Sequence, residues 1–188
     1  MSAPDWLRRL TRKPLRTRRL VIRPLRRGDE RLVYPAVRES LRELAPWLIW
    51  ARRDYDLAVC RHFVRAAIEN YAGGRDYALI MMTRGGDFVG GTGFHRRGPA
   101  GALYYEIGYW CRSSLAGRGY TTEAVKALLR YAFRASSLRR IEIRCDPRNR
   151  ASERVIVKAG LAKEGHMRKV ARDLKGRLHD QLVYAKVR

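Results

Sequence analysis

The segment from residue 104 to residue 133 constrains this 188-residue chain more than any other. Aromatic and β-branched side chains between Tyr104 and Trp110 predict a strand, because such side chains pack well on a pleated sheet. Apolar residues then recur at three- and four-residue spacing up to residue 133, which predicts a helix. Between the two lies Ala-Gly-Arg-Gly-Tyr-Thr at 116–121, whose glycines permit a tight inward turn. We expect its backbone N–H groups and the helix N-terminus to bind a phosphate.

This loop also has a simpler interpretation as an ordinary connection between a strand and a helix. The Gly-Lys-Ser/Thr of a P-loop does not follow it, and the Gly-x-Gly-x-x-Gly fingerprint of dinucleotide-binding proteins is not present. The loop by itself therefore leaves phosphate binding and a plain turn as alternatives, and the segments around it must decide.

The net charge of +23, from 41 lysines and arginines against 18 acidic residues, is the unusual feature of the composition. Such charge is typical of proteins that contact a polyanion such as RNA or a ribosomal surface, or an acidic protein. An arginine-biased genome is the alternative explanation, and we favour an anionic partner. The 3 cysteines and 4 histidines have no metal-ligand spacing, so we expect no metal site and a reducing cytoplasmic location. No apolar stretch is long enough to cross a membrane, so we expect no membrane contact.

Two parts of the chain are predicted: a basic leader at residues 1–19, either loose or draped on the surface, and one folded domain at residues 20–188. The helix at 56–71 is expected to bury Val59, Phe63, Ala66 and Ala67. The order of elements predicts an α+β fold with a mixed sheet covered by helices on its faces. Strands are expected at 20–25, 77–83, 88–94, 104–110, 140–145, 164–170 and 178–187, with further helices after Gly28-Asp29 and at 152–159.

Three segments together resemble the GNAT acyl-CoA N-acyltransferases, in the RimJ/RimL branch that acetylates the N-termini of ribosomal proteins. The first is the strand at 17–25, and the second is the strand at 106–110 followed by the glycine loop at 117–124. The third combines Asn149-x-x-Ser152 with a Lys-x-Gly-Leu at 158–161 and a Glu-Gly-x-x-Arg at 164–168. The segments occur in the family's order. The resemblance implies a single GNAT domain with about six or seven mostly antiparallel strands, opened at the acetyl-CoA site.

The same resemblance implies which residues hold acetyl-CoA. The turn would supply amides for the pyrophosphate, and the backbone after the strand would pair with the pantetheine arm like an added strand. Asn149 would bind the arm or the phosphates, and Lys158 a phosphate of CoA, although a solvated lysine is an equal alternative. Ala116 and Thr121 depart from the family's usual residues, which would weaken binding without removing the turn. The implied cofactor residues are Trp110, Cys111, Arg112, Gly117, Arg118, Gly119, Tyr120, Thr121, Thr122, Asn149 and Lys158.

Two residues are the candidates for catalysis. Glu106, on the strand before the loop, would take a proton from the acceptor amine; its alternative role is an ion pair with one of the many arginines. Ser152 matches the position that is thought to protonate the CoA sulfur, and it is also a candidate helix N-cap. Val170 and Ala171 lie where some relatives carry a carboxylate, so a water relay from that strand is not expected.

The expected function is acetyl transfer to a primary amine by direct attack in a ternary complex, with the N-terminal amine of a ribosomal protein as acceptor. One alternative is a small amine such as an aminoglycoside or a polyamine, although a strongly basic surface would repel such cations. The other is a non-catalytic module that binds acyl-CoA or the ribosome. The acceptor would be chosen by residues 32–50 and 169–178, and the sequence does not distinguish a monomer from a homodimer.

Overall fold

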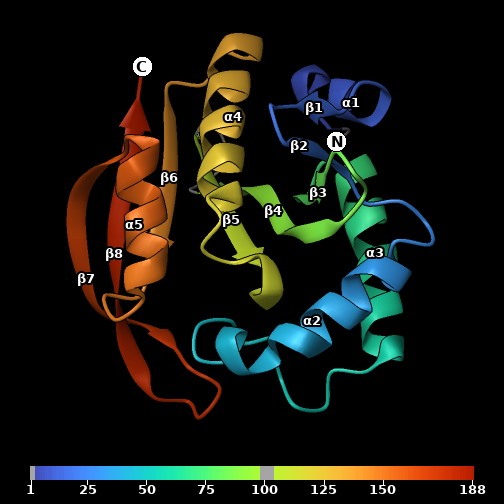
Figure 1. Ribbon diagram of the computed structural model, residues 1–188. Helices are drawn as coiled ribbons and strands as arrows, with labels where there is room; N and C mark the ends of the chain where they lie inside the picture. Colours follow the sequence, from blue (N-terminus) through green and yellow to red (C-terminus); the bar gives the residue numbers. More distant parts are fainter. Residues whose placement is uncertain (1–2, 98–103) are drawn as a thin grey trace.

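The computed structural model describes residues 3–97 and 104–188. In this part of the chain, eight strands form one sheet in the order β1-β2-β3-β4-β5-β6-β8-β7, with helices on both faces (Figure 1). The α+β class and the mostly antiparallel sheet are confirmed, and the eighth strand is the two-residue β1. The helices are α1 (Asp5–Arg12), α2 (Glu30–Leu44), α3 (Leu57–Ala72), α4 (Tyr120–Ala135) and α5 (Arg150–Ala159). The strands are β1 (Leu15–Arg16), β2 (Leu20–Pro24), β3 (Tyr77–Thr83), β4 (Phe88–Arg97), β5 (Tyr104–Cys111), β6 (Arg140–Cys145), β7 (Ala162–Arg172) and β8 (Leu178–Val187).

The sheet opens between β5 and β6, which form its parallel pair. These strands are paired at three positions, the last of which joins Glu106 to Glu142. Beyond that point β5 stays paired with β4 as far as Cys111, and β6 stays paired with β8 as far as Cys145 (Figure 1). The facing edges therefore diverge, and the edge of β5 from residue 107 onward is not covered by β6. The expected opening of the sheet is present.

Helix α1 packs into the core, so the expectation of a loose leader was wrong for this segment. Trp6, Leu7 and Leu10 are at most 7% exposed. The Trp6 ring meets Phe94 and Tyr105 edge-on, with centroid distances of 5.1 and 5.8 Å. The arginines of this helix occupy its outer face, so a strongly basic composition conceals a narrow apolar stripe. The boundary between residues 19 and 20 stays a prediction.

Each face of the sheet has its own apolar core. Helices α1, α4 and α5 cover one face, and α2 and α3 cover the other. Helix α3 follows the predicted bounds, and Asp56 caps it by accepting the Val59 N–H at 2.7 Å. The expected buried face was right at Ala67 but wrong at Val59 and Phe63, which are 48% and 45% exposed. The other buried residues of α3 are Cys60, Val64 and Tyr71. When a helix is apolar over most of its surface, its sequence does not indicate which face is buried, so tertiary packing decides the buried face. Across the described residues, no helix has the length and apolarity that a membrane crossing requires.

Candidate active site

The predicted strand, loop and helix are present at the open end of β5. A short turn at Ser113–Leu115 leads to Gly117 and Gly119, whose φ angles of +75° and +78° lie in the left-handed region that favours glycine. Helix α4 begins directly afterwards. The N–H groups of residues 117–122 have no hydrogen-bond acceptor within the described chain, and the next one, that of Glu123, donates to the Gly119 carbonyl at 3.1 Å. This row of unpaired N–H groups at a helix N-terminus fits a phosphate anion.

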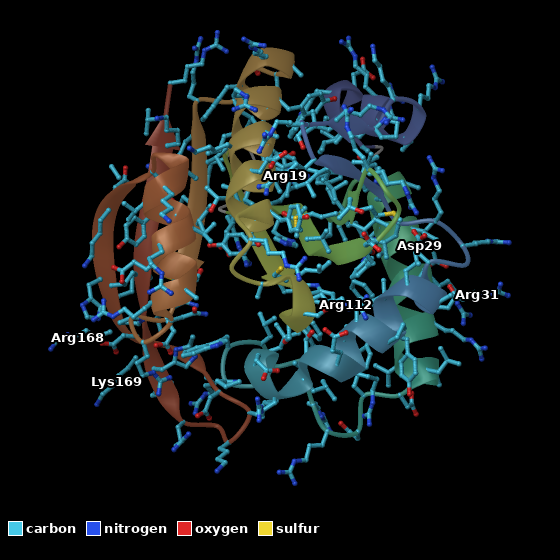
Figure 2. The ribbon with its side chains drawn as sticks, viewed as in Figure 1. Arg19, Asp29, Arg31, Arg112, Arg168 and Lys169 are labelled. Atoms are coloured by element: carbon cyan, nitrogen blue, oxygen red, sulfur yellow. The ribbon has the colours of Figure 1, made fainter. Side chains whose placement is uncertain are left out.

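Glu123 fastens this loop to the N-terminal segment. Its carboxylate accepts from Thr17 Oγ1 at 2.6 Å, from the Arg19 N–H at 2.9 Å and from Arg19 Nε at 2.6 Å. Arg19 also donates to the Arg118 carbonyl at 3.0 Å and lies over the Tyr120 ring, beside α4 (Figure 2). Burial raises the pKa of Glu123, but these hydrogen bonds outweigh it and hold the pKa below its ordinary value. Sequence reasoning missed Thr17 and Arg19, because nothing local indicates contacts across about 100 residues.

The turn before the glycines is anchored on α2. Arg112 forms an ion pair with Glu39 at 2.6 Å, and Glu39 also accepts the Ser114 N–H at 2.9 Å. The Ser113 N–H donates to Ser40 Oγ at 2.9 Å. Figure 2 shows Arg112 in the region between β5 and α2. The Arg112 side chain therefore holds the loop in place. Only the Arg112 backbone is left for the role expected from the sequence, which is pairing with the pantetheine arm.

Ser152 lies across the opening from β5. Helix α5 begins at Arg150, two residues earlier than predicted, and its N-cap is Asn149 rather than Ser152: Asn149 Oδ1 accepts the Ser152 N–H at 3.0 Å. Ser152 Oγ is 2.9 Å from Tyr109 Oη, which also donates to the Ser152 carbonyl at 3.2 Å. Burial raises the pKa of Tyr109, so this phenol stays protonated at any physiological pH. Tyr109 was not among the predicted site residues.

Glu106 lies where β5 and β6 part. Arg97 Nε donates to its carboxylate at 2.9 Å, and Arg144 Nε is 3.7 Å away. The side chain is 14% exposed. This arrangement matches the ion-pair alternative given for Glu106 in the sequence analysis. Because side chains alternate between the faces of a strand, Glu106 and Tyr109 lie on opposite faces, so Glu106 and Ser152 approach the opening from opposite sides.

The remaining predicted cofactor residues fall into two groups: Trp110 and Cys111 at the end of β5, and residues on the helices α4 and α5. The Trp110 side chain packs on Phe88 and Trp50, with centroid distances of 5.7 and 5.9 Å, so only its backbone is available at the open edge. Burial raises the pKa of the Cys111 thiol, which therefore stays neutral and suits packing rather than nucleophilic attack. Lys158 is exposed on α5, whereas Tyr120, Thr121 and Thr122 form the partly buried first turn of α4. Together the open edge, the unpaired N–H groups and Asn149 fit an extended ligand that ends in phosphates.

Among the residues that the structure describes, no group of three or more His, Cys, Asp and Glu side chains could hold a metal ion.

The chain is similar to known N-acetyltransferases. The chain is 28% identical to the uncharacterized N-acetyltransferase YnaD of Bacillus subtilis over 155 residues, which cover 81% of this chain and 85% of that protein. It is 32% identical to the ribosomal-protein-serine acetyltransferase of Escherichia coli over 60% of this chain and 63% of that protein. A solved structure of Mycobacterium smegmatis RimJ in complex with CoA-disulfide aligns with a TM-score of 0.78 at 25% identity, covering 89% of this chain and 81% of that one.

A family model for the acetyltransferase (GNAT) domain matches residues 19–162, which is well over half of the chain. The match includes the opened sheet, the glycine loop and the start of α5. This chain therefore belongs to the GNAT family of N-acetyltransferases.

Proposed function

We propose that this protein transfers the acetyl group of acetyl-CoA to the N-terminal α-amine of a protein, such as a ribosomal protein, in the cytoplasm. The observation that carries the proposal is the row of unpaired N–H groups at residues 117–122, directly beyond the open edge of β5. A diphosphate fits the first feature, and an extended amide-bearing arm fits the second. Both features occur in one molecule of acetyl-CoA, in the same order.

Acetyl-CoA supplies the activated acyl group as a thioester. The acceptor nitrogen forms the new C–N bond while the C–S bond breaks, so the nitrogen must lose a proton and the sulfur must gain one. Ser152 would donate a hydrogen bond to the departing sulfur. Tyr109 would orient Ser152, because its hydroxyl contacts both the Oγ and the carbonyl of that serine. Tyr109 thus acts as a positioning residue rather than as an acid.

We propose Glu106 as the group that takes the proton from the acceptor nitrogen, directly or through water. Its position at the last paired residue of β5 and β6 supports this role, as does its approach from the face opposite Ser152. Its carboxylate also forms ion pairs with Arg97 at 2.9 Å and with Arg144 at 3.7 Å, which hold it in place.

The acceptor class rests on similarity to the Escherichia coli ribosomal-protein-serine acetyltransferase. A net charge of +23 also suits a ribosomal or acidic partner better than a cationic aminoglycoside or polyamine. The three cysteines are free thiols, as is usual for proteins of a reducing compartment.

The test is thiol release from acetyl-CoA by the purified protein, with short peptides that carry a free N-terminus, compared with the same peptides blocked by N-terminal formylation. Kanamycin and spermine serve as the competing acceptor classes. We expect turnover on the free peptides, and loss of turnover in Glu106→Gln with CoA affinity retained. Turnover on spermine or kanamycin but not on free peptides would reject the protein acceptor. Failure to bind CoA would reject the proposal as a whole.

A further inference from the structure

A cavity of about 770 Å³ lies between the C-terminal end of α2 and the hairpin of β7 and β8. In Figure 1 the tip of this hairpin extends below the sheet toward α2. The volume is within the range of ordinary ligand sites. The lining residues come from three separate segments, and the charged ones are Arg42, Arg53, Arg148, Asp173, Lys175 and Arg177.

The cavity is strongly and asymmetrically charged. Five of its lining side chains are cationic and one, Asp173, is a carboxylate. Asp173 is already neutralised by Arg177, whose guanidinium is 2.8 Å away. Arg53 and Lys175 have no acidic partner within 4.0 Å in the described chain. The cavity therefore presents unneutralised positive charge to whatever enters it.

The cavity is also partly apolar, and it adjoins the catalytic elements. Trp47 and Leu174 contribute exposed apolar surface on its two sides, with exposed fractions of 36% and 44%. Arg148 lines the cavity and is held by Asp146 at 2.6 Å; the next residue, Asn149, caps the helix that carries Ser152. On the other side, α2 carries the Glu39 that anchors the loop after β5. A chain whose terminus lies at the opening of the sheet would thus continue into this cavity.

We infer that this cavity binds an acidic polypeptide segment directly after the acceptor amine, so that the enzyme selects protein N-termini followed by aspartate or glutamate. The inference rests on the proposed function, because the amine must lie at the opening between β5 and β6. Carboxylates complement the unpaired Arg53 and Lys175, and the apolar walls suit the side chains between those carboxylates. RNA would use the same cations. Its bases would stack on aromatic side chains, however, and Trp47 is the one aromatic residue among the lining residues, whereas Leu174 suits an aliphatic side chain.

The test compares binding and turnover for three peptides of equal length that share an N-terminal serine and differ in residues two to five: alternating Asp and Ala, all Ala, and alternating Lys and Ala. Binding is measured by fluorescence anisotropy of C-terminally labelled peptides, which needs no catalysis. Exposed ion pairs each contribute little, so the two carboxylates predict up to about a tenfold advantage in Kd and in kcat/KM for the acidic peptide over the alanine peptide. The advantage should fall as salt is raised.

The variant is the double charge reversal Arg53→Glu with Lys175→Glu, and its matched control is the double reversal Arg61→Glu with Arg65→Glu on the exposed side of α3. Both variants change the net charge equally, and all four side chains are exposed. We expect the cavity variant to lose the preference for the acidic peptide, so that its Kd values for the acidic and alanine peptides become equal. The control variant should keep the preference.

Equal Kd values for acidic and alanine peptides in the native protein would overturn the inference, even if every peptide is acetylated. Equal loss of the preference in both double variants would overturn it as well, because the effect would then be one of net charge. So would an oligouridylate that binds more tightly than the acidic peptide and loses that affinity in the cavity variant. Charge-dependent binding of the acidic peptide with no acetylation of any peptide would support the inference while rejecting the proposed function.

Discussion

The hydroxyl of Tyr109 offers a sharp test of how Ser152 is held for catalysis. It lies 2.9 Å from Ser152 Oγ and donates to the Ser152 carbonyl at 3.2 Å, so Tyr109→Phe removes these contacts and keeps the ring. A neutral hydrogen bond contributes a net ~1 kcal/mol, which for a chain of this size corresponds to a fall in Tm of about 2–4 °C. If the same loss appears in the transition state because Ser152 is poorly oriented, kcat should fall about fivefold.

Ser152→Ala removes the proposed donor itself, and for a positioned proton donor we expect a fall in kcat of about 100-fold. Because Tyr109 is proposed to act through Ser152, adding Tyr109→Phe to Ser152→Ala should lower kcat little further. The assay is steady-state acetylation of a peptide, with CoA affinity measured separately by calorimetry. Both single variants should bind CoA within about twofold of the native protein.

Tyr71→Phe is the matched control, since the Tyr71 hydroxyl is also buried and donates to the Leu7 carbonyl at 2.7 Å, outside the site. It should lower Tm by a similar amount and leave kcat unchanged. A fall in Tm with unchanged kcat for Tyr109→Phe would reduce the contact to a structural role. An equal fall in kcat for Tyr109→Phe with and without Ser152 would show that the phenol acts independently, and either result would refute the reasoning.

Three further predictions concern the loop, the N-terminal helix and acid stability. Gly119→Ala places a Cβ on a residue whose φ is +78°, and it should weaken CoA binding about tenfold in calorimetry. The control is Gly86→Ala, at φ +101° in a distant turn. It should lower stability by a similar amount in thermal unfolding and leave CoA affinity unchanged. Trp6→Ala should lower the free energy of unfolding by about 3–5 kcal/mol in urea titrations, and a change below 1 kcal/mol would contradict the core position of α1. Arg148 holds the pKa of Asp146 below its ordinary value of 3.8. The stability from this pair is therefore present above pH 3.8 and is lost as the pH falls below it. Asp146→Asn should reduce the dependence of the free energy of unfolding on pH in this acidic range.

Local pattern in the sequence was sufficient for most elements from β2 to β8 and for the tight turn of the glycine loop. Strands β2, β6 and β8 and the loop before α4 appear close to where they were predicted, because each rests on side-chain periodicity or on a backbone angle that glycine permits. The helix expected at 152–159 is present as α5, although it begins at Arg150 and its cap is Asn149 rather than Ser152. Such features depend on neighbours a few residues away.

The tertiary structure decided everything that joins distant segments. No local pattern indicates that α3 turns Phe63 outward or that Arg19 binds a glutamate 104 positions later, and the apolar stripe of α1 does not specify which face of the sheet it covers. The same holds for the contact of Tyr109 with Ser152 and for the basic cavity formed by three separate segments of the chain. The physical reason is that these contacts depend on how layers pack around a shared sheet, and packing selects among faces and partners that the local pattern leaves equivalent.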